Sequence, residues 1–200
     1  MLSTSFRNLI NEGGRELKSR DSIFVALLRG INVGGKNLIS MSLLKASLER
    51  LGFEDVSTYI NSGNIIFRSK EDSARKLERD IEKMLSQEYR LGCKVVVRSV
   101  SEMAELVKNL PDHGKDDKRW KYNVMFLRHS IDNPDILAGL HPRSDIEQVV
   151  YLPGVLLWSA LTSDLTRSTM LKLSSQKIYQ EMTVRNLNTT RKLYERMKSM

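Results

Sequence analysis

The stretch Arg29-Gly30-Ile31-Asn32-Val33-Gly34-Gly35-Lys36-Asn37 decides how this chain is organised. It follows the apolar run 23–28, which is typical of a buried strand, and precedes apolar residues at helical spacing from Met41 to Leu51. We therefore predict a glycine-rich loop that connects a strand to a helix. Its glycines let the backbone turn tightly and approach a ligand closely. Positive charge and amide donors come from Arg29, Asn32, Lys36 and Asn37, so the loop suits an anion site or a difficult turn.

The elements around this loop predict a split βαββαβ unit. The predicted strands are 23–29, 56–60, 65–67 and 93–98, and the predicted helices are 41–51 and a second helix that begins near Ala74 and ends before Gly92. This order is that of the ferredoxin-like fold, in which the first and third strands lie side by side. The turn Asn61-Ser62-Gly63-Asn64 precedes the third strand. The sequence leaves open whether it lies at the same end of the sheet as the glycine-rich loop.

For the second half of the chain we predict the order of elements βαββαα. Ser99 and Glu102 form a capping box for a third helix, which Pro111 ends before a polar segment. The later predictions are a strand at 120–128, a short helix from Pro134, a hairpin of 146–152 and 155–160, and helices at 169–180 and 189–198. This half is only a partial echo of the first, without a repeat at the level of residues. We expect an α+β protein with an N-terminal extension (1–21), a ferredoxin-like subdomain (22–98), a connecting helix and polar loop (99–119) and a C-terminal α+β subdomain (120–200).

Composition narrows the class of partner. The 200 residues carry a net charge of +8, and eight basic against two acidic residues after 165 place most of it in the C-terminal region. Such a charge favours anionic partners. No apolar run approaches the roughly 20 residues of a membrane span, so we expect no membrane partner. Cys93 is the only cysteine, which excludes an intrachain disulfide and fits a reducing cytoplasm.

Neither a metal nor a cofactor is expected. The three histidines are scattered, and none pairs with another at the spacing of metal ligands. Cys93 opens an apolar run and is expected to fill space in a strand rather than to act as a nucleophile. No nucleophile–base pair stands out elsewhere, and the oligomeric state is left open.

The loop also resembles a phosphate loop without matching it. Gly30 to Asn37 spells G-x-x-x-x-G-K-N, whereas nucleotide hydrolases have Ser or Thr at the last position to bind magnesium. No later strand ends in the aspartate that usually completes the magnesium site. We predict that the chain hydrolyses neither ATP nor GTP. A general phosphate site and a purely structural turn both stay open.

Two further segments add polar side chains. The link 185–189 places several of them before the last helix, with Asn188 or Thr189 expected as its cap. Arg167-Ser168 precedes the other late helix in the same manner. The candidate ligand-binding residues are therefore Arg29, Gly30, Asn32, Gly34, Gly35, Lys36, Asn37, Asn61, Ser62, Asn64, Arg167, Ser168, Arg185, Asn186, Asn188 and Thr189.

We expect the 29–37 loop and the 185–189 link to face one another across a cleft. Their side chains offer many donors and few acceptors, and an anion between them would satisfy the donors and screen the like charges. In an alternative interpretation the two segments form a latch without a ligand. Asn32 and Asn186 would then hydrogen-bond to the backbone of the opposite segment.

Three motifs resemble an uncharacterised bacterial family, domain of unknown function 1697. They are Leu27-Leu28-Arg29-Gly30-Ile31-Asn32-Val33-Gly34-Gly35-Lys36-Asn37, Thr58-Tyr59-Ile60-Asn61-Ser62-Gly63-Asn64 and Arg185-Asn186-Leu187-Asn188-Thr189. The resemblance extends from about Ile23 to the C-terminus. It implies an α+β fold with ferredoxin-like topology, and it implies no established activity.

These patterns favour a cytoplasmic protein that binds a phosphate-bearing ligand, either a small molecule or nucleic acid. Only Phe24 and Phe67 offer the aromatic rings that an RNA-binding sheet exposes on its central strands. One alternative is an enzyme that acts on a small phosphorylated or acidic metabolite, with Lys36 or Arg185 stabilising charge. Another is a protein-interaction module whose polar loops are structural only.

Overall fold

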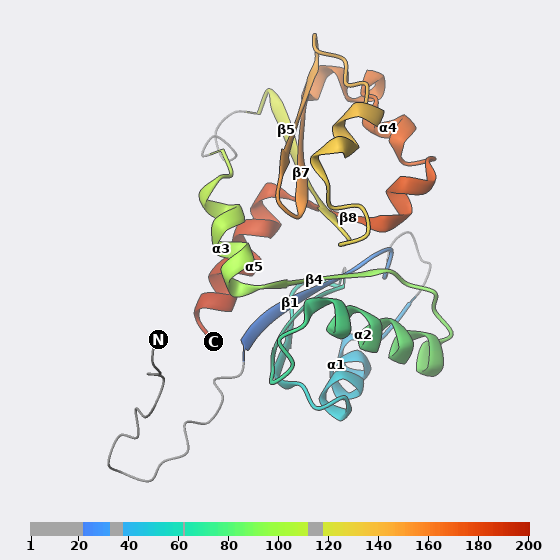
Figure 1. The fold of residues 1–200 in the computed structure, drawn as a ribbon, viewed down its shortest axis with the longest axis vertical. Coiled ribbons are helices and arrows are strands. Elements are labelled where there is room, and N and C mark those ends of the chain that lie inside the picture. Colours follow the sequence, from blue (N-terminus) through green and yellow to red (C-terminus); the bar gives the residue numbers. More distant parts are fainter. Residues whose placement is uncertain (1–21, 33–37, 62, 112–117) are drawn as a thin grey trace, which may run out of the picture.

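The structure is a computed structural model that describes residues 22–32, 38–61, 63–111 and 118–200. The predicted extension 1–21 lies outside the described residues, as do 33–37, residue 62 and 112–117. Two four-stranded antiparallel sheets form two units that follow one another along the molecule's long axis (Figure 1). The protein is therefore α+β, as predicted.

The first unit has the predicted βαββαβ order and ferredoxin-like topology, because its strands lie in the order β2-β3-β1-β4. Its elements are β1 (Ser22–Leu28), α1 (Met41–Arg50), β2 (Glu54–Thr58), β3 (Asn64–Ser69), α2 (Ala74–Tyr89) and β4 (Val95–Ser99). The register sets Leu27 at the end of β1 opposite Asn64 at the start of β3. The turn before β3 and the loop after β1 therefore lie at the same end of the sheet, which decides the question that the sequence left open.

Both faces of this first sheet are covered. Phe24 and Phe67 are buried beneath α1 and α2, with ring centroids 5.9 Å apart. The opposite face, which includes Val25 and Ile66, packs against α3 (Val100–Lys108) and α5 (Leu187–Lys198). An RNA-binding surface built from Phe24 and Phe67 is therefore not available on this sheet.

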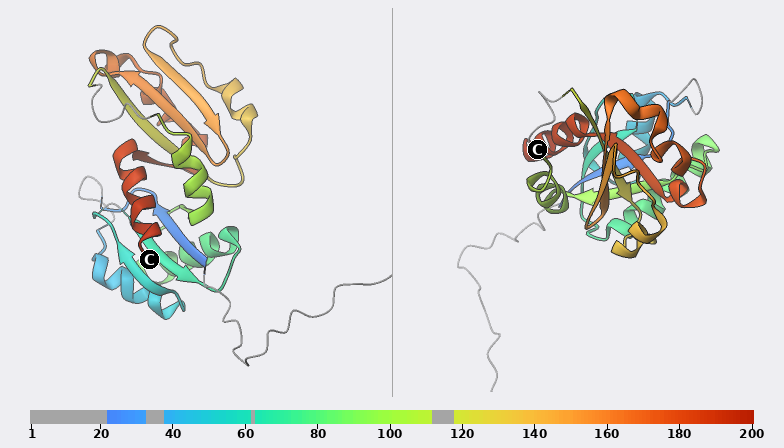
Figure 2. Two further views of the ribbon diagram at one scale, coloured as in Figure 1. Left: turned by 90° about the vertical axis from the view of Figure 1, so that its left-hand side faces the viewer. Right: turned by 90° about the horizontal axis from the view of Figure 1, so that it is seen from above.

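Helix α3 begins with the predicted capping box. The Ser99 hydroxyl accepts a hydrogen bond from the Glu102 backbone N–H, and the Glu102 carboxylate accepts one from the Ser99 backbone N–H at 2.7 Å. Helices α3 and α5 pack against one another and lie beside both sheets (Figures 1 and 2). Together they join the two units.

The second unit contains the predicted hairpin and one strand that the prediction missed. Its elements are β5 (Trp120–Leu127), the 3₁₀-helix η2 (Pro134–Gly139), β6 (Glu147–Leu152), β7 (Val155–Leu161), η3 (Thr162–Arg167), α4 (Met170–Leu173), η4 (Lys177–Glu181), β8 (Met182–Asn186) and α5. The predicted order βαββαα was wrong, because β8 lies between the last two helical segments. The last helix also starts earlier than expected, at Leu187.

The predicted helix 169–180 is broken into α4 and η4. The hydroxyl of Ser174 donates to Leu171 O at 2.6 Å, and that of Ser175 donates to Lys172 O at 2.7 Å. Such side-chain bonds compete with a continuing helix. Leu173 is the only buried residue of α4, so little apolar packing opposes the break.

With β8 in place, the second sheet repeats the topology of the first, in the order β6-β7-β5-β8. One short segment occupies equivalent places in the two units. Val97-Arg98-Ser99-Val100 leads from β4 into α3, and Val184-Arg185-Asn186-Leu187 leads from β8 into α5. Arg98 lies opposite Val25 of β1, and Arg185 lies opposite Val124 of β5. Only the Val-Arg pair is identical in these two segments, so the echo between the two halves is one of topology, with this pair at equivalent places.

Candidate functional site

Arg185 connects the last strand of the second unit to the first unit. Its Nη2 donates to Leu28 O at 3.0 Å and to Gly63 O at 3.3 Å, and its Nη1 donates to Val184 O at 2.8 Å. Leu28 ends β1 and Gly63 lies in the turn before β3. The side chain therefore holds β8 against the exit of β1.

Arg98 makes the reciprocal connection at the opposite end of the interface. Its Nη2 donates to Leu127 O, which ends β5, and to Gly154 O at 3.0 Å, which lies in the turn before β7. Its Nη1 donates to Val97 O at 2.8 Å. Each acceptor occupies the same place in its unit as one of the acceptors of Arg185. The repeated topology thus places one arginine at each end of the interface, with Arg98 buried and Arg185 partly buried.

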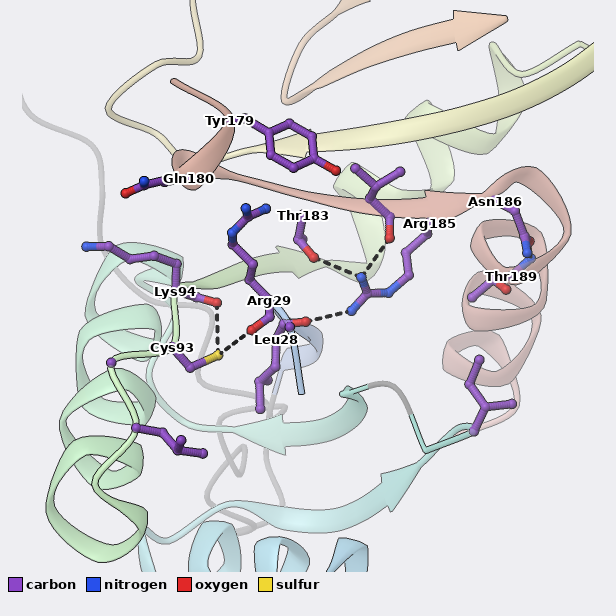
Figure 3. A pocket seen from close by; sticks show the side chains of 15 residues that line it. Leu28, Arg29, Cys93, Lys94, Tyr179, Gln180, Thr183, Arg185, Asn186 and Thr189 are labelled. Atoms are coloured by element: carbon purple, nitrogen blue, oxygen red, sulfur yellow. Dashed lines mark hydrogen bonds between the residues drawn. The ribbon is translucent and has the colours of Figure 1, made fainter. Parts of the chain in front are cut away.

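A cavity of about 810 Å³ opens between the units beside Arg185, and we call it the inter-unit cavity. Figure 3 shows Arg29 and Arg185 at its centre, Cys93 and Lys94 on one side, and the start of α5 on the other. The lining residues are Leu28, Arg29, Gly30, Ile60, Leu91, Gly92, Cys93, Lys94, Tyr179, Gln180, Thr183, Val184, Arg185, Asn186 and Thr189. Both units therefore contribute cationic and hydrogen-bonding groups.

The three cationic side chains that line the inter-unit cavity have different partners. The Arg29 guanidinium lies over the ring of Tyr179, 4.6 Å from its centroid, and donates to Met182 O at 3.0 Å. The Lys94 ammonium is 3.9 Å from a carboxylate oxygen of Glu181. Burial lowers the pKa of the Arg185 guanidinium to about 10, so this group stays charged at neutral pH.

Cys93 is buried and unsuited to nucleophilic chemistry. Its Sγ lies 3.1 Å from Arg29 O, to which the thiol can donate. Burial raises the pKa of the thiol to about 11, so it is protonated at neutral pH. The residue fills space beside β4, as the sequence predicted.

The N-terminus of α5 reaches the cavity through its cap. Asn186 Oδ1 accepts a hydrogen bond from the Thr189 backbone N–H at 2.7 Å, and both residues line the cavity. The expectation that Asn188 or Thr189 caps this helix was wrong, and Asn188 is exposed. Asn186 takes the role because β8 ends there and the helix begins one residue later.

The structure brings part of the predicted site together. Of the candidate residues, the inter-unit cavity gathers Arg29, Gly30, Arg185, Asn186 and Thr189. Asn64 is buried next to it, and its side-chain oxygen accepts a hydrogen bond from Arg185 Nε. Asn61 is exposed in the turn and does not line the cavity. The candidates Gly34, Gly35, Lys36, Asn37 and Ser62 lie outside the described residues.

The two units are connected near these segments, but not by Asn32 and Asn186. Asn32 adopts a left-handed backbone conformation with φ 55°, and its side chain bonds Ile39 N at 2.8 Å and Ile39 O at 3.0 Å. It therefore closes its own loop, while Asn186 caps its own helix. The expected crossing by Asn32 and Asn186 was wrong, and Arg29 and Arg185 reach the opposite unit instead.

Arg167 and Ser168 belong to a different part of the second unit. The Ser168 hydroxyl donates to the buried carboxylate of Glu147 at 2.5 Å, and the Arg167 guanidinium pairs with Asp164 at 2.6 Å. Neither residue lines the inter-unit cavity. Their resemblance to the 185–189 link was misleading, because these side chains satisfy acidic neighbours.

The sequence prediction missed Lys94 and Tyr179. Lys94 follows Cys93 just before β4, and Tyr179 lies in η4, so each reaches the cavity only through the packing of the two units. No spacing in the sequence marks either residue. Within the described residues no three His, Cys, Asp or Glu side chains gather as metal ligands would, and no helix there is long and apolar enough to cross a bilayer.

Comparison with known proteins places the chain in a family. Among solved structures it is similar to the conserved bacterial protein SP0830 from Streptococcus pneumoniae, at 27% sequence identity and a TM-score of 0.77. The likeness covers 88% of this chain and 98% of that one. No curated protein matches the chain significantly. The family model "Protein of unknown function (DUF1697)" matches residues 22–158, which include the first two motifs and not the 185–189 link. This chain therefore belongs to the DUF1697 family.

Proposed function

We propose that this protein binds a small phosphate-bearing molecule in the inter-unit cavity. One observation carries the proposal: the cavity draws Arg29, Lys94 and Arg185 together from both units at the N-terminus of α5. Anions are stabilised at helix N-termini by the backbone amides and the helix dipole. A volume of about 810 Å³ is within the range of sites for small organic ligands.

The charges of the wall support an anion rather than a cation. The acceptors of Arg29 and Arg185 include the neutral carbonyl oxygens of Met182, Leu28 and Gly63. These bonds orient the two guanidinium groups while leaving their positive charge in place. Glu181 near Lys94 offsets only part of the total. A phosphate group can accept hydrogen bonds from the Lys94 ammonium and the Arg29 guanidinium. Arg185 contributes its charge, because its five N–H groups already donate to Asn64 Oδ1, Thr183 Oγ1 and the carbonyls of Val184, Leu28 and Gly63.

The remaining wall suits an organic portion. The Tyr179 ring and the side chains of Leu91 and Ile60 supply apolar surface, and the Ile60 side chain is 51% exposed. The cavity is larger than a phosphate group requires. We therefore expect a phosphorylated metabolite or a mononucleotide rather than inorganic phosphate alone.

A small molecule is favoured over nucleic acid because basic side chains of α5 have structural partners. Arg191 Nη2 donates to Pro111 O at 2.8 Å, and the Arg196 guanidinium lies 4.7 Å from the ring centroid of Tyr59. The aromatic side chains of the first sheet, Phe24 and Phe67, are buried as well and cannot stack on nucleic acid bases. Nucleic acid fragments that copurify with the protein would reverse this preference.

Two experiments test the proposal. The purified protein is denatured, and mass spectrometry of the small molecules that it releases should identify a copurified phosphorylated compound. In thermal unfolding, phosphorylated metabolites and nucleotides should raise the midpoint of the wild type, because a ligand of the native state stabilises it. The rise should be lost in Lys94→Gln and kept in Lys172→Gln, which removes an exposed lysine of α4 outside the cavity. If no such compound raises the midpoint, or if both variants respond alike, the proposal is wrong.

A further inference from the structure

The opposite end of the interface has a cavity of its own. It has a volume of about 250 Å³ and is lined by Arg75, Glu78 and Arg79 of α2 and by Arg128, His129 and Ser130 after β5. Arg128 and His129 follow β5 as Arg29 and Gly30 follow β1, and Arg98 reaches the end of β5 as Arg185 reaches the end of β1. This small cavity is therefore the counterpart of the inter-unit cavity in the repeated architecture.

We propose that the small cavity is a second anion site, which takes a single tetrahedral oxyanion such as a phosphate group. The observation that first points to a ligand is His129 Nε2, which is buried and has no hydrogen-bond partner among the described residues. Nearly all buried polar atoms in folded proteins have a partner, and an exception calls for a water or an ion. An oxyanion accepts a hydrogen bond from an imidazole N–H, and it reaches Nε2 of this residue when the ring of His129 turns toward the cavity that it lines.

The guanidinium groups around His129 supply the charge for an anion. Arg75 and Arg79 lie one helical turn apart on α2, and neither makes a hydrogen bond or a salt bridge in the described part of the chain. Arg128 is shared between two carboxylates, with its Nη1 3.2 Å from Glu82 and 3.4 Å from Glu181. Two guanidinium groups thus line the cavity with free donors, and guanidinium groups bind phosphate oxygens well.

One carboxylate opposes this charge. Glu78 lines the cavity, and its Oε1 accepts a hydrogen bond from Val97 N at 3.0 Å. Burial raises the pKa of Glu78, which reduces the share of its charged form. Arg75 and Arg79 outnumber this single carboxylate in the wall of the cavity, whereas the charge of Arg128 is offset by Glu82 and Glu181. The balance there remains positive.

Size limits the ligand. The volume of about 250 Å³ is below the roughly 300–1,000 Å³ of sites that enclose small organic molecules. A phosphate group fits, and any larger substituent on it would extend into solvent past the exposed side chains of Arg75 and Arg79. Free phosphate and the phosphate group of a larger molecule share this chemistry, and a titration with each distinguishes them.

Occupancy should change the ionisation of His129. Burial lowers the pKa of its imidazole, and Arg98 and Arg75 lower it further, while Glu102 and Asp132 oppose them. Arg79, Arg128 and Glu78 also face the cavity. The imidazole is therefore neutral at neutral pH and can donate one N–H. A bound dianion favours the protonated ring and raises the pKa of His129.

Nuclear magnetic resonance of protein carrying ¹⁵N-labelled histidine tests this site directly. His129→Gln assigns the signal among the three histidines. Inorganic phosphate, titrated at constant ionic strength, should shift the His129 signal and raise its pKa. Loss of the charge-assisted bonds in the Arg75→Gln/Arg79→Gln double variant should weaken phosphate binding by about tenfold or more. Both arginines are exposed, so the variant should fold.

Lys83→Gln, which removes an exposed lysine from the same helix outside the cavity, is the matched control and should bind phosphate as the wild type does. Arg29→Gln, which changes the inter-unit cavity without touching the carboxylates that hold Arg128, should also leave the His129 response unchanged, which separates this site from the inter-unit cavity. A phosphorylated metabolite that shifts His129 at lower concentration than inorganic phosphate would identify the phosphate group of a larger molecule as the ligand. A His129 signal that phosphate does not move overturns the proposal. A shift that persists in the double variant, or one that Lys83→Gln also abolishes, overturns it too.

Discussion

Arg98 and Arg185 each donate to the carbonyl of a hairpin glycine in the other unit, Gly154 O at 3.0 Å and Gly63 O at 3.3 Å. Each also donates to the last carbonyl of the other unit's first strand, Leu127 O or Leu28 O. In its own unit each donates to the carbonyl of the preceding valine, Val97 or Val184. The two side chains therefore fix the units to one another at both ends of the interface.

Replacing either arginine by methionine should destabilise the protein. Arg98→Met leaves the Leu127 and Gly154 carbonyls buried without this donor, at a cost of about 3 kcal/mol in the free energy of unfolding. Arg185→Met should cost a similar amount. Urea denaturation of both variants and of the double variant measures this. Because both residues hold one interface, the double variant should lose less than the sum of the two single losses. Strictly additive losses would mean that the two ends act independently.

Alanine at Gly154 should be harmful for two reasons. Its φ of +84° disfavours any side chain, and an added Cβ would lie 2.9 Å from Arg98 Nε. Gly52 has a φ of +88° with open space around it, so Gly52→Ala isolates the cost of the backbone conformation. We expect about 1 kcal/mol for Gly52→Ala and clearly more for Gly154→Ala in urea denaturation. Equal losses would show that the Arg98 side chain moves aside freely.

The two helix caps after β4 and β8 should be equivalent. Ser99 and Asn186 each accept a hydrogen bond from the backbone N–H three residues later. Ser99→Ala and Asn186→Ala should each lower the free energy of unfolding by about 1 kcal/mol. Exposed Asn188 is the control, and Asn188→Ala should change stability little. A larger loss for Asn188→Ala than for Asn186→Ala would contradict the observed cap.

The second unit should lose stability in acid through Glu147. Burial alone would raise the pKa of this carboxyl, but hydrogen bonds from Ser168, Thr169 and the Arg143 backbone N–H outweigh burial and lower the pKa to about 2. The unfolded carboxyl has a pKa of about 4.3, so the charged form is favoured in the folded state. Its stabilisation is present above that value and is lost as the pH falls toward 2. The full amount is on the order of 3 kcal/mol.

Urea denaturation between pH 7 and pH 2.5 tests this, followed by tryptophan fluorescence in the variant Trp120→Phe, which leaves Trp158 as the single tryptophan. The indole N–H of Trp158 donates to Glu147 at 3.0 Å. Glu147→Gln should be less stable than the wild type at neutral pH, and the difference should shrink in acid. A difference that is constant with pH would show that the ionisation of Glu147 contributes nothing.

Cys93 should react slowly with thiol reagents in the native protein. A thiol with a pKa of about 11 has, at pH 8, roughly two orders of magnitude less thiolate than an ordinary cysteine of pKa about 8.5. Burial slows access further. Because the chain has one cysteine, the rate of reaction with a disulfide reagent reports this site alone. Protein unfolded in urea should react at the ordinary rate, and a native rate as fast as that would contradict the raised pKa.

Periodic patterns predicted most of the fold. Apolar residues at helical spacing marked α1 and α2, and the Ser99–Glu102 capping box marked the start of α3, because these signals are local. Strand β8 was missed since its five residues are too short and too polar for a clear alternation. Only its pairing with β5 makes it a strand.

The candidate site was predictable only where one segment carries several polar groups. Arg29 and Arg185 were marked by their neighbours in the chain, and they meet at one cavity. Tyr179 and Lys94 join them through the packing of distant elements, which no local pattern records. The partners of Ser168 were hidden for the same reason, since Glu147 lies 21 residues away.

The repeat has a consequence for how the two cavities can differ. In a two-fold symmetric homodimer, each subunit presents the same groups to the other across the interface. Every substitution in such an interface therefore occurs twice. Here the two sides belong to one chain, so a change can be made at one end alone. Gly30 stands after β1 where His129 stands after β5. One interface thus has a cavity of about 810 Å³ at one end and one of about 250 Å³ at the other, an asymmetry that a symmetric pair of identical subunits could not have.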